Sequence, residues 1–138
     1  GKLGWKFVSA KWSYSLMSET FGVRDSRGTW YLDLGADIPL GESGLTANLH
    51  WGYQKYTGRD PVNVGGVSND DAWSYKDWKA GLSYALPKDF TVGAYWTKTY
   101  GANLLGYGAF TQAIAAINGP YPSEIGKSTG TVYVQKTF

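Results

Sequence analysis

The stretch "LTANLHWGY", residues 45–53, alternates apolar and polar side chains without interruption. Successive side chains of a β-strand point to opposite faces of a sheet, so this pattern places five apolar side chains on one face. The other face receives Thr46, Asn48, His50 and Gly52, all of which tolerate water. The stretch therefore predicts a strand that separates an apolar environment from a wet one.

The same alternation recurs in five further segments, and composition agrees with an all-β fold. The expected strands cover residues 4–16, 29–39, 45–57, 73–86, 90–100 and 130–138. The 138 residues include 7 Trp, 11 Tyr and 19 Gly, which favour strands and turns over helices. The absence of Cys excludes disulfides and thiolate zinc sites, and a net charge of +2 gives no basic patch for nucleic acid.

Soluble sandwiches and lipocalin-like barrels also alternate, but three features favour a membrane barrel. The apolar stripes are about 9–11 residues long, which matches a tilted strand that crosses hydrocarbon. Aromatic residues often begin or end the stripes, as interfacial girdles require. Short turns alternate with long loops at 17–28, 58–72 and 101–128, as periplasmic turns and outer loops do. We expect one antiparallel up-and-down transmembrane β-barrel domain over residues 1–138, in the bacterial outer membrane.

The last segment, "GTVYVQKTF" at residues 130–138, ends on an aromatic residue. A closed barrel pairs its last strand with its first, because lipid offers no partner to an unpaired backbone group. Phe138 is expected to seat this strand at the lipid interface. A terminal Phe also resembles the signal by which outer-membrane proteins reach the barrel-insertion machinery.

Several stretches together resemble the C-terminal half of the TorF family of bacterial porins. They are "WKFVSAKWSYSLMSETFGV" (5–23), "GTWYLDLGADIPL" (28–40), "GLTANLHWGYQKYTG" (44–58), "SYKDWKAGLSYAL" (74–86), "FTVGAYWTKT" (90–99) and the final "KTF". The resemblance implies an outer-membrane protein of Gram-negative bacteria with pore function, and it transfers no catalytic residue. Members of that family usually carry further strands upstream.

Six strands conflict with single-chain bacterial barrels, which begin at eight. The chain is then a fragment without its upstream strands, or two more strands lie in the long loops, or several chains close one barrel. The resemblance favours the fragment.

The polar faces of the expected strands would line a water-filled lumen. The expected pore-lining residues are Lys11, Asp33, Asp37, Asn48, His50, Gln54, Asp77, Lys79, Tyr95, Tyr133 and Gln135. With neutral His50, three carboxylates against two ammonium groups predict at most a weak preference for cations.

The loop at 101–128 contains "AFTQAIAAINGP", whose apolar residues recur at helical spacing. Its apolar face either packs on the rim or folds inward and narrows the pore. The candidate constriction residues are Tyr107, Phe110, Ile114 and Ile117.

Catalysis and metal binding receive little support from the residues. A catalytic triad would need His50 beside a nucleophile and an acidic residue, and Asp33 or Asp37 lies on the neighbouring strand. We interpret His50 and these aspartates as lumen residues rather than as a triad. The segment "SNDD" (68–71) with Asp60 is interpreted as a solvated loop rather than a calcium site, because it lacks EF-hand spacing. We expect no enzyme activity, cofactor or metal.

The expected function is passive diffusion of small hydrophilic solutes through the lumen. The alternative is a closed barrel with a structural or surface-binding role, since small barrels are often filled by side chains. A soluble carbohydrate-binding β-protein is disfavoured because Trp residues follow the apolar stripes.

Overall fold

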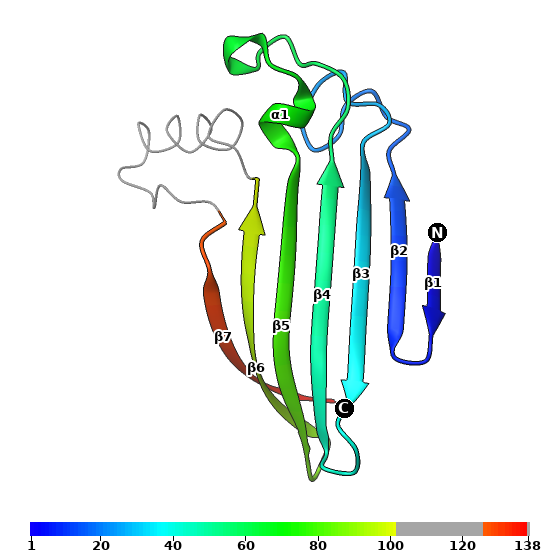
Figure 1. Cartoon of the computed structure of the whole chain (residues 1–138), viewed down its shortest axis with the longest axis vertical. Coiled ribbons are helices and arrows are strands. Elements are labelled where there is room, and N and C mark those ends of the chain that lie inside the picture. Colours follow the sequence, from blue (N-terminus) through cyan, green and yellow to red (C-terminus); the bar gives the residue numbers. More distant parts are fainter. Residues whose placement is uncertain (102–125, 138) are drawn as a thin grey trace.

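The computed structural model describes residues 1–101 and 126–137, and they form one open antiparallel sheet of seven strands (Figure 1). Strand order follows chain order from β1 to β7. The strands are β1 (Lys2–Trp5), β2 (Val8–Tyr14), β3 (Trp30–Pro39), β4 (Leu45–Lys55), β5 (Tyr75–Leu86), β6 (Phe90–Tyr100) and β7 (Thr129–Lys136). A 3-10 turn, η1 (Val64–Gly66), and a short helix, α1 (Asn69–Trp73), lie between β4 and β5.

The prediction of six strands, the first over 4–16, was wrong. This segment folds as the β1–β2 hairpin, with Trp5 opposite Val8 and a two-residue turn that contains Lys6 at a φ of 50°. The apolar positions are odd up to Phe7 and even from Val8 onward. That change of phase marks the turn, because a continuous strand keeps one phase.

The other five strands lie where the alternation predicts them, within a few residues at their ends. The start of the segment predicted at 73–86 differs by two residues, because Trp73 ends α1 and β5 begins at Tyr75. The two described long loops contain one isolated bridge, Thr20 with Val23, and add no strand to the sheet.

The register places apolar residues beside apolar residues across the whole sheet. One row joins Val8, Ala36, Leu49, Ala80 and Trp96 on successive strands from β2 to β6. Directly opposed residues of an antiparallel pair point to the same face, so the predicted apolar stripes form a single apolar face.

No described part of the chain covers this apolar face, and its large side chains are exposed. Trp12 is 54% exposed, Leu49 46% and Val132 78%. The sheet therefore has no conventional hydrophobic core on that side.

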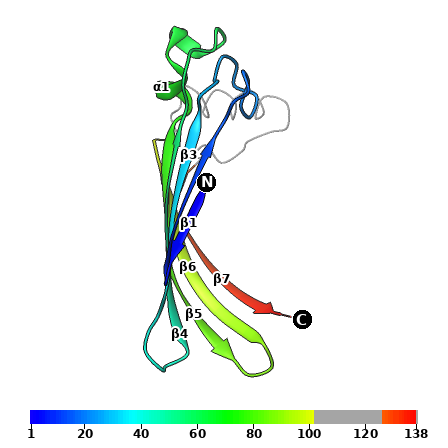
Figure 2. The same ribbon diagram turned by 90° about the vertical axis from the view of Figure 1, so that its right-hand side faces the viewer.

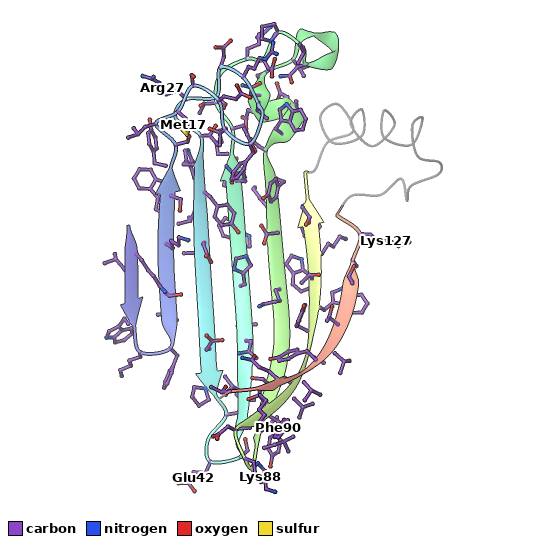
Figure 3. All side chains as sticks on the ribbon, turned by 180° about the vertical axis from the view of Figure 1, so that it is seen from behind. Met17, Arg27, Glu42, Lys88, Phe90 and Lys127 are labelled. Atoms are coloured by element: carbon purple, nitrogen blue, oxygen red, sulfur yellow. The ribbon has the colours of Figure 1, made fainter. Side chains whose placement is uncertain are left out.

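The two described long loops and the short turns lie at opposite ends of the sheet (Figure 1). Figure 3 labels Met17 and Arg27 at the loop end, and Glu42 and Lys88 in the short turns at the other end. β6 and β7 bend away from the plane of the other strands (Figure 2). The polar face is concave there, because Asp37 of β3 and Tyr133 of β7 line one hollow although three strands separate them.

Most of the buried side chains among the described residues lie at the loop end, where residues 15–29 and 56–74 pack together. We call these two segments the loop cap. Its buried residues are mainly polar, and they are Val23, Ser26, Thr29, Tyr56, Asp60, Asn63, Asn69 and Ala72. Among the described residues, no helix is long and apolar enough to cross a membrane.

Candidate functional site

The eleven predicted pore-lining residues share the polar face of the sheet. The register joins Lys11, Asp33, Gly52 and Asp77 in one row. The next row contains His50 and Lys79, and the row after it Asp37, Asn48 and Tyr95. Gln54, Tyr133 and Gln135 lie at the same alternate positions of β4 and β7. The alternation rule therefore identifies one face, whose charged residues are concentrated along the middle of β3, β4 and β5.

His50 lies between two carboxylates from the strands on either side. Its Nδ1 is 3.1 Å from Oδ1 of Asp33 on β3, and its Nε2 is 2.8 Å from Oδ1 of Asp77 on β5. The side chains of Asp33, His50 and Asp77 are 35%, 24% and 26% exposed, so the cluster is half-buried in the polar face. Asp37 does not join it; Nδ2 of Asn48 donates to Asp37 at 2.7 Å instead.

The two carboxylates determine what the imidazole can do. A neutral imidazole carries one N–H and therefore donates to one carboxylate, whereas an imidazolium donates to both. Either form directs a ring nitrogen at each carboxylate and leaves no lone pair aimed at a serine, which a Ser–His–Asp triad requires. Within the described residues, the imidazole therefore contacts two carboxylates, and the arrangement does not have the geometry of a nucleophile with its general base.

Tyr31 completes the cluster, and sequence reasoning missed its role. Its hydroxyl lies 3.4 Å from His50 Nε2 and 3.4 Å from Asp77 Oδ2. Gly52 makes the space, because a Cβ there would overlap the Tyr31 hydroxyl and approach Asp77 Oδ2 to 2.6 Å. The register of β3, β4 and β5 brings these residues together. No single segment of the sequence therefore shows a pattern that predicts the contact between Tyr31 and His50.

A second group of predicted residues lines a hollow of about 260 Å³ towards the short-turn end. The rings of Tyr95 and Tyr133 are 6.0 Å apart, and the Lys79 ammonium lies 5.3 Å from the centre of the Tyr95 ring. Asp37, Asn48 and Gln135 also line this hollow. Lys79 is thereby held over a ring face by a cation–π contact.

The two remaining predicted lining residues belong to neither group. Gln54 is 6% exposed and its Nε2 donates to the Trp30 carbonyl at 3.3 Å. Lys11 lies opposite Asp33 in the register, and it lines a separate hollow near the β1 edge.

The acidic loop segment is an internal network of hydrogen bonds. Oδ2 of Asp60 accepts from the Arg24 amide at 2.9 Å, and Oδ1 accepts from the Val62 amide at 3.0 Å. Asn69 is fully buried and is bonded within the loop cap. No group of three or more potential metal ligands occurs among the described residues. The candidate constriction residues Tyr107, Phe110, Ile114 and Ile117, and the terminal Phe138, lie outside the described residues.

Comparison with known proteins gave one match. Searches of curated proteins and of solved structures found none. The model of a bacterial family, described as "Bacterial protein of unknown function (Gcw_chp)", matches residues 1–138. Because this match extends over the whole chain, the protein belongs to the Gcw_chp family.

Proposed function

We propose that this chain forms part of the wall of an outer-membrane β-barrel through which small hydrophilic solutes diffuse. The observation that carries the proposal is the contrast between the two faces of one sheet. The apolar face is exposed on all seven strands, whereas the concave face carries charges, hydroxyls and amides.

Hydrocarbon is the environment that fits the apolar face best. Contiguous exposed apolar surface of this extent marks a contact with lipid or with another protein. The strands β3 to β6 have 10, 11, 12 and 11 residues, which is the length that a tilted strand needs to cross a bilayer. The exposed side chains include Leu34, Leu49, Leu82 and Val132. A carbohydrate-binding surface explains exposed Trp rings but not these aliphatic residues.

Strand direction sets a condition on how such a barrel closes. β1 and β7 run in the same direction, because every neighbouring pair from β1 to β7 is antiparallel. A fully antiparallel ring has an even number of strands. The proposed barrel therefore takes an odd number of strands from beyond this sheet, in agreement with the resemblance to longer TorF porins.

A closed barrel without an open channel is the second candidate, and the polar face supplies an observation in its favour. Tyr31, Tyr75, Tyr95 and Tyr133 project from this face, and the His50 cluster connects three strands across it. In a narrow barrel, side chains of this size fill the lumen.

Two measurements on the complete barrel, reconstituted with the strands that close it, separate these functions. Single-Trp variants that retain Trp51, Trp96 or Trp73 report membrane insertion through quenching by lipids brominated in the acyl chain. Trp51 and Trp96 lie on the apolar face and should be quenched, whereas Trp73, whose Nε1 donates to Asn63 in the loop cap, should not. Conductance steps in planar bilayers then report the pore.

Each outcome assigns one function. Quenching with conductance steps supports a diffusion pore. Quenching without steps supports the closed barrel and rejects the pore. Equal quenching of Trp51 and Trp73 contradicts the assignment of the apolar face to lipid.

A further inference from the structure

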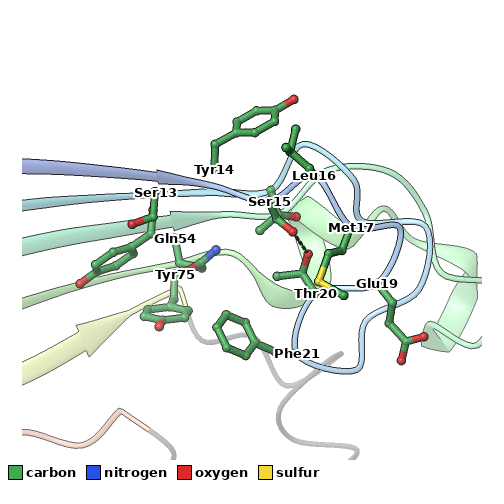
Figure 4. A pocket seen from close by; sticks show the side chains of 12 residues that line it. Ser13, Tyr14, Ser15, Leu16, Met17, Glu19, Thr20, Phe21, Gln54 and Tyr75 are labelled. Carbon is green, nitrogen blue, oxygen red and sulfur yellow. Dashed lines mark hydrogen bonds between the residues drawn. The ribbon is translucent and has the colours of Figure 1, made fainter. Parts of the chain in front are cut away.

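We propose that the loop over residues 15–29 and the polar face beneath it form a binding site for small organic cations. The site is a hollow at the loop end of the sheet, and it shares Tyr31 with the His50 cluster (Figure 4). It is built by the sheet and one of its loops, so its existence does not require an open channel.

The hollow has the size and composition of a small-molecule site. Its volume is about 840 Å³, within the range of about 300–1,000 Å³ that such sites occupy. Phe21 and Met17 of the loop line it together with Tyr31, Gln54 and Tyr75 of the sheet. Figure 4 shows the Phe21 ring on the same side of the sheet as Gln54 and Tyr75. Its lining is mainly apolar with a few polar groups, as in known ligand pockets.

The backbone conformation at Phe21 is strained. Thr20 and Val23 exchange backbone hydrogen bonds of 3.2 and 3.1 Å around a turn whose central residues, Phe21 and Gly22, have φ values of 50° and 83°. Turns with positive φ at both centres favour Asn-Gly or Asp-Gly, and a bulky residue at the first centre is strained. The Phe21 side chain is nevertheless 88% exposed, so packing within the described chain does not explain it. Strain at an exposed aromatic residue indicates a function.

The turn that carries Phe21 is fixed in place. The Thr20 amide donates to Ser26 Oγ at 2.8 Å, and the Thr20 hydroxyl donates to Ser15 Oγ at 2.8 Å. Ser26 is fully buried, and the Arg24 amide donates to Asp60 in the other loop. This anchoring reduces the backbone entropy that the loop loses when a ligand binds.

The electrostatics of the hollow favour a cation. Among the described residues that line it, Glu19 carries a carboxylate and none carries an ammonium or guanidinium group. The hydroxyl of Tyr31 lies 3.4 Å from Asp77 Oδ2, so a second carboxylate adjoins the hollow. The faces of Phe21, Tyr31 and Tyr75 also attract cations, and such rings recognise quaternary ammonium groups. A cation with an apolar body therefore complements the lining better than an anion or a neutral solute.

Isothermal titration of the folded chain in detergent tests the site with three probes: benzyltrimethylammonium, benzyl alcohol and benzoate. Binding of the cation alone is expected, after subtraction of the heat of its titration into empty micelles. Phe21→Asn should weaken binding about five- to thirty-fold through loss of the ring. Glu19→Gln should weaken it about two- to five-fold.

Two controls separate binding from folding. Phe7→Ala removes an aromatic side chain, 52% exposed, in the β1–β2 turn and should leave binding unchanged. Phe21→Asn should unfold at the same or a higher temperature than the unmodified chain, since Asn tolerates positive φ. Equal binding of the three probes overturns the proposal, and so does cation binding that Phe21→Asn and Phe7→Ala affect to the same degree.

Discussion

At the scale of single residues, His50 is the centre of the polar face. It separates the carboxylates of Asp33 and Asp77. The sequence contains one histidine, and it is His50. Without the imidazole, the two carboxylates face each other across β4 and lose the ring nitrogens that lie next to them. A residue that occupies the space between two carboxylates inside a proposed lumen should influence the ion preference of that lumen.

His50→Ala should increase the preference of the pore for cations. The substitution removes the imidazole that separates the carboxylates of Asp33 and Asp77, so their oxygen atoms become accessible to cations in the lumen. The measurement is the reversal potential in a KCl gradient across a planar bilayer. Thr97→Ala, in the same row of the sheet, is the control and should leave the potential unchanged. A potential that is unchanged in His50→Ala would place the cluster outside the ion path.

At the scale of elements, a buried polar network holds the loop cap together. Asn69 Oδ1 accepts from the Asp60 amide at 2.7 Å and from Asn63 Nδ2 at 2.9 Å. Its Nδ2 donates to the carbonyls of Arg24 and Thr57 at 2.9 and 2.8 Å. One side chain thus joins both loops, and the loop cap depends on hydrogen bonds where most domains depend on apolar packing.

Asn69→Ala should destabilise the loop cap by about 3 kcal/mol or more, because several buried groups lose their partner at once. Asn48→Ala is the matched control. Its amide makes one hydrogen bond, to Asp37 on the polar face, and its loss should cost about 1 kcal/mol. Hydrogen exchange of residues 15–29 and 56–74 measures the effect. Equal protection of these segments in both variants would show that Asn69 does not hold the loops.

The loop cap should also loosen in acid through Asp60. Burial opposes the charge of this carboxylate, but the amides of Val62 and Arg24 outweigh burial and lower the pKa of Asp60 below its ordinary value. A carboxyl group whose pKa is lower in the folded state stabilises the fold above its unfolded pKa, about 3.9. That contribution is lost as the pH falls through the folded-state pKa.

Limited proteolysis of the loop cap between pH 7 and pH 3, with an acid-tolerant protease, follows this loss. Cleavage should increase only at the acid end in the unmodified chain. Asp60→Asn replaces one of the two acceptor oxygens by an amide nitrogen, so its loops should be cleaved faster already at pH 7. Identical cleavage of both proteins at every pH would contradict a role for the Asp60 carboxylate.

At the scale of the whole molecule, an added positive charge should destabilise the protein when it lies on the apolar face and have little effect on stability when it lies on the polar face. Leu34→Arg places a guanidinium at the middle of β3 on the apolar face, at a cost of about 2–4 kcal/mol if that position lies at the bilayer midplane. Asn48→Arg places it on the polar face, where it can donate to Asp37, and folding should be little affected. Gly81→Arg is a poor control, because a Cβ there approaches the Ala94 carbonyl oxygen to 2.6 Å. Heat-modifiable mobility in gels measures folding, and equal loss in both variants would refute the assignment of faces.

Local pattern was sufficient for five strands and for the faces of the sheet. Alternation is a property of each strand by itself, so "LTANLHWGY" carries its own assignment of faces. The β1–β2 hairpin was missed because its turn uses Lys6 at positive φ, without the Gly or Asn that usually marks such a turn. The barrel and its membrane location stay predictions.

Contacts between distant segments were decided by the tertiary structure alone. Asp77 reaches His50 because the β4–β5 register places Asp77 opposite Gly52, two residues from His50 on the same face. That register depends on the pairing of whole strands. The position of Phe21 over the sheet likewise depends on the hydrogen bond from Arg24 to Asp60, 36 residues apart. The sequence by itself determined which side chains share a face, because that depends on neighbours along one strand. The tertiary structure decided which of them meet, because that depends on partners that no single segment contains.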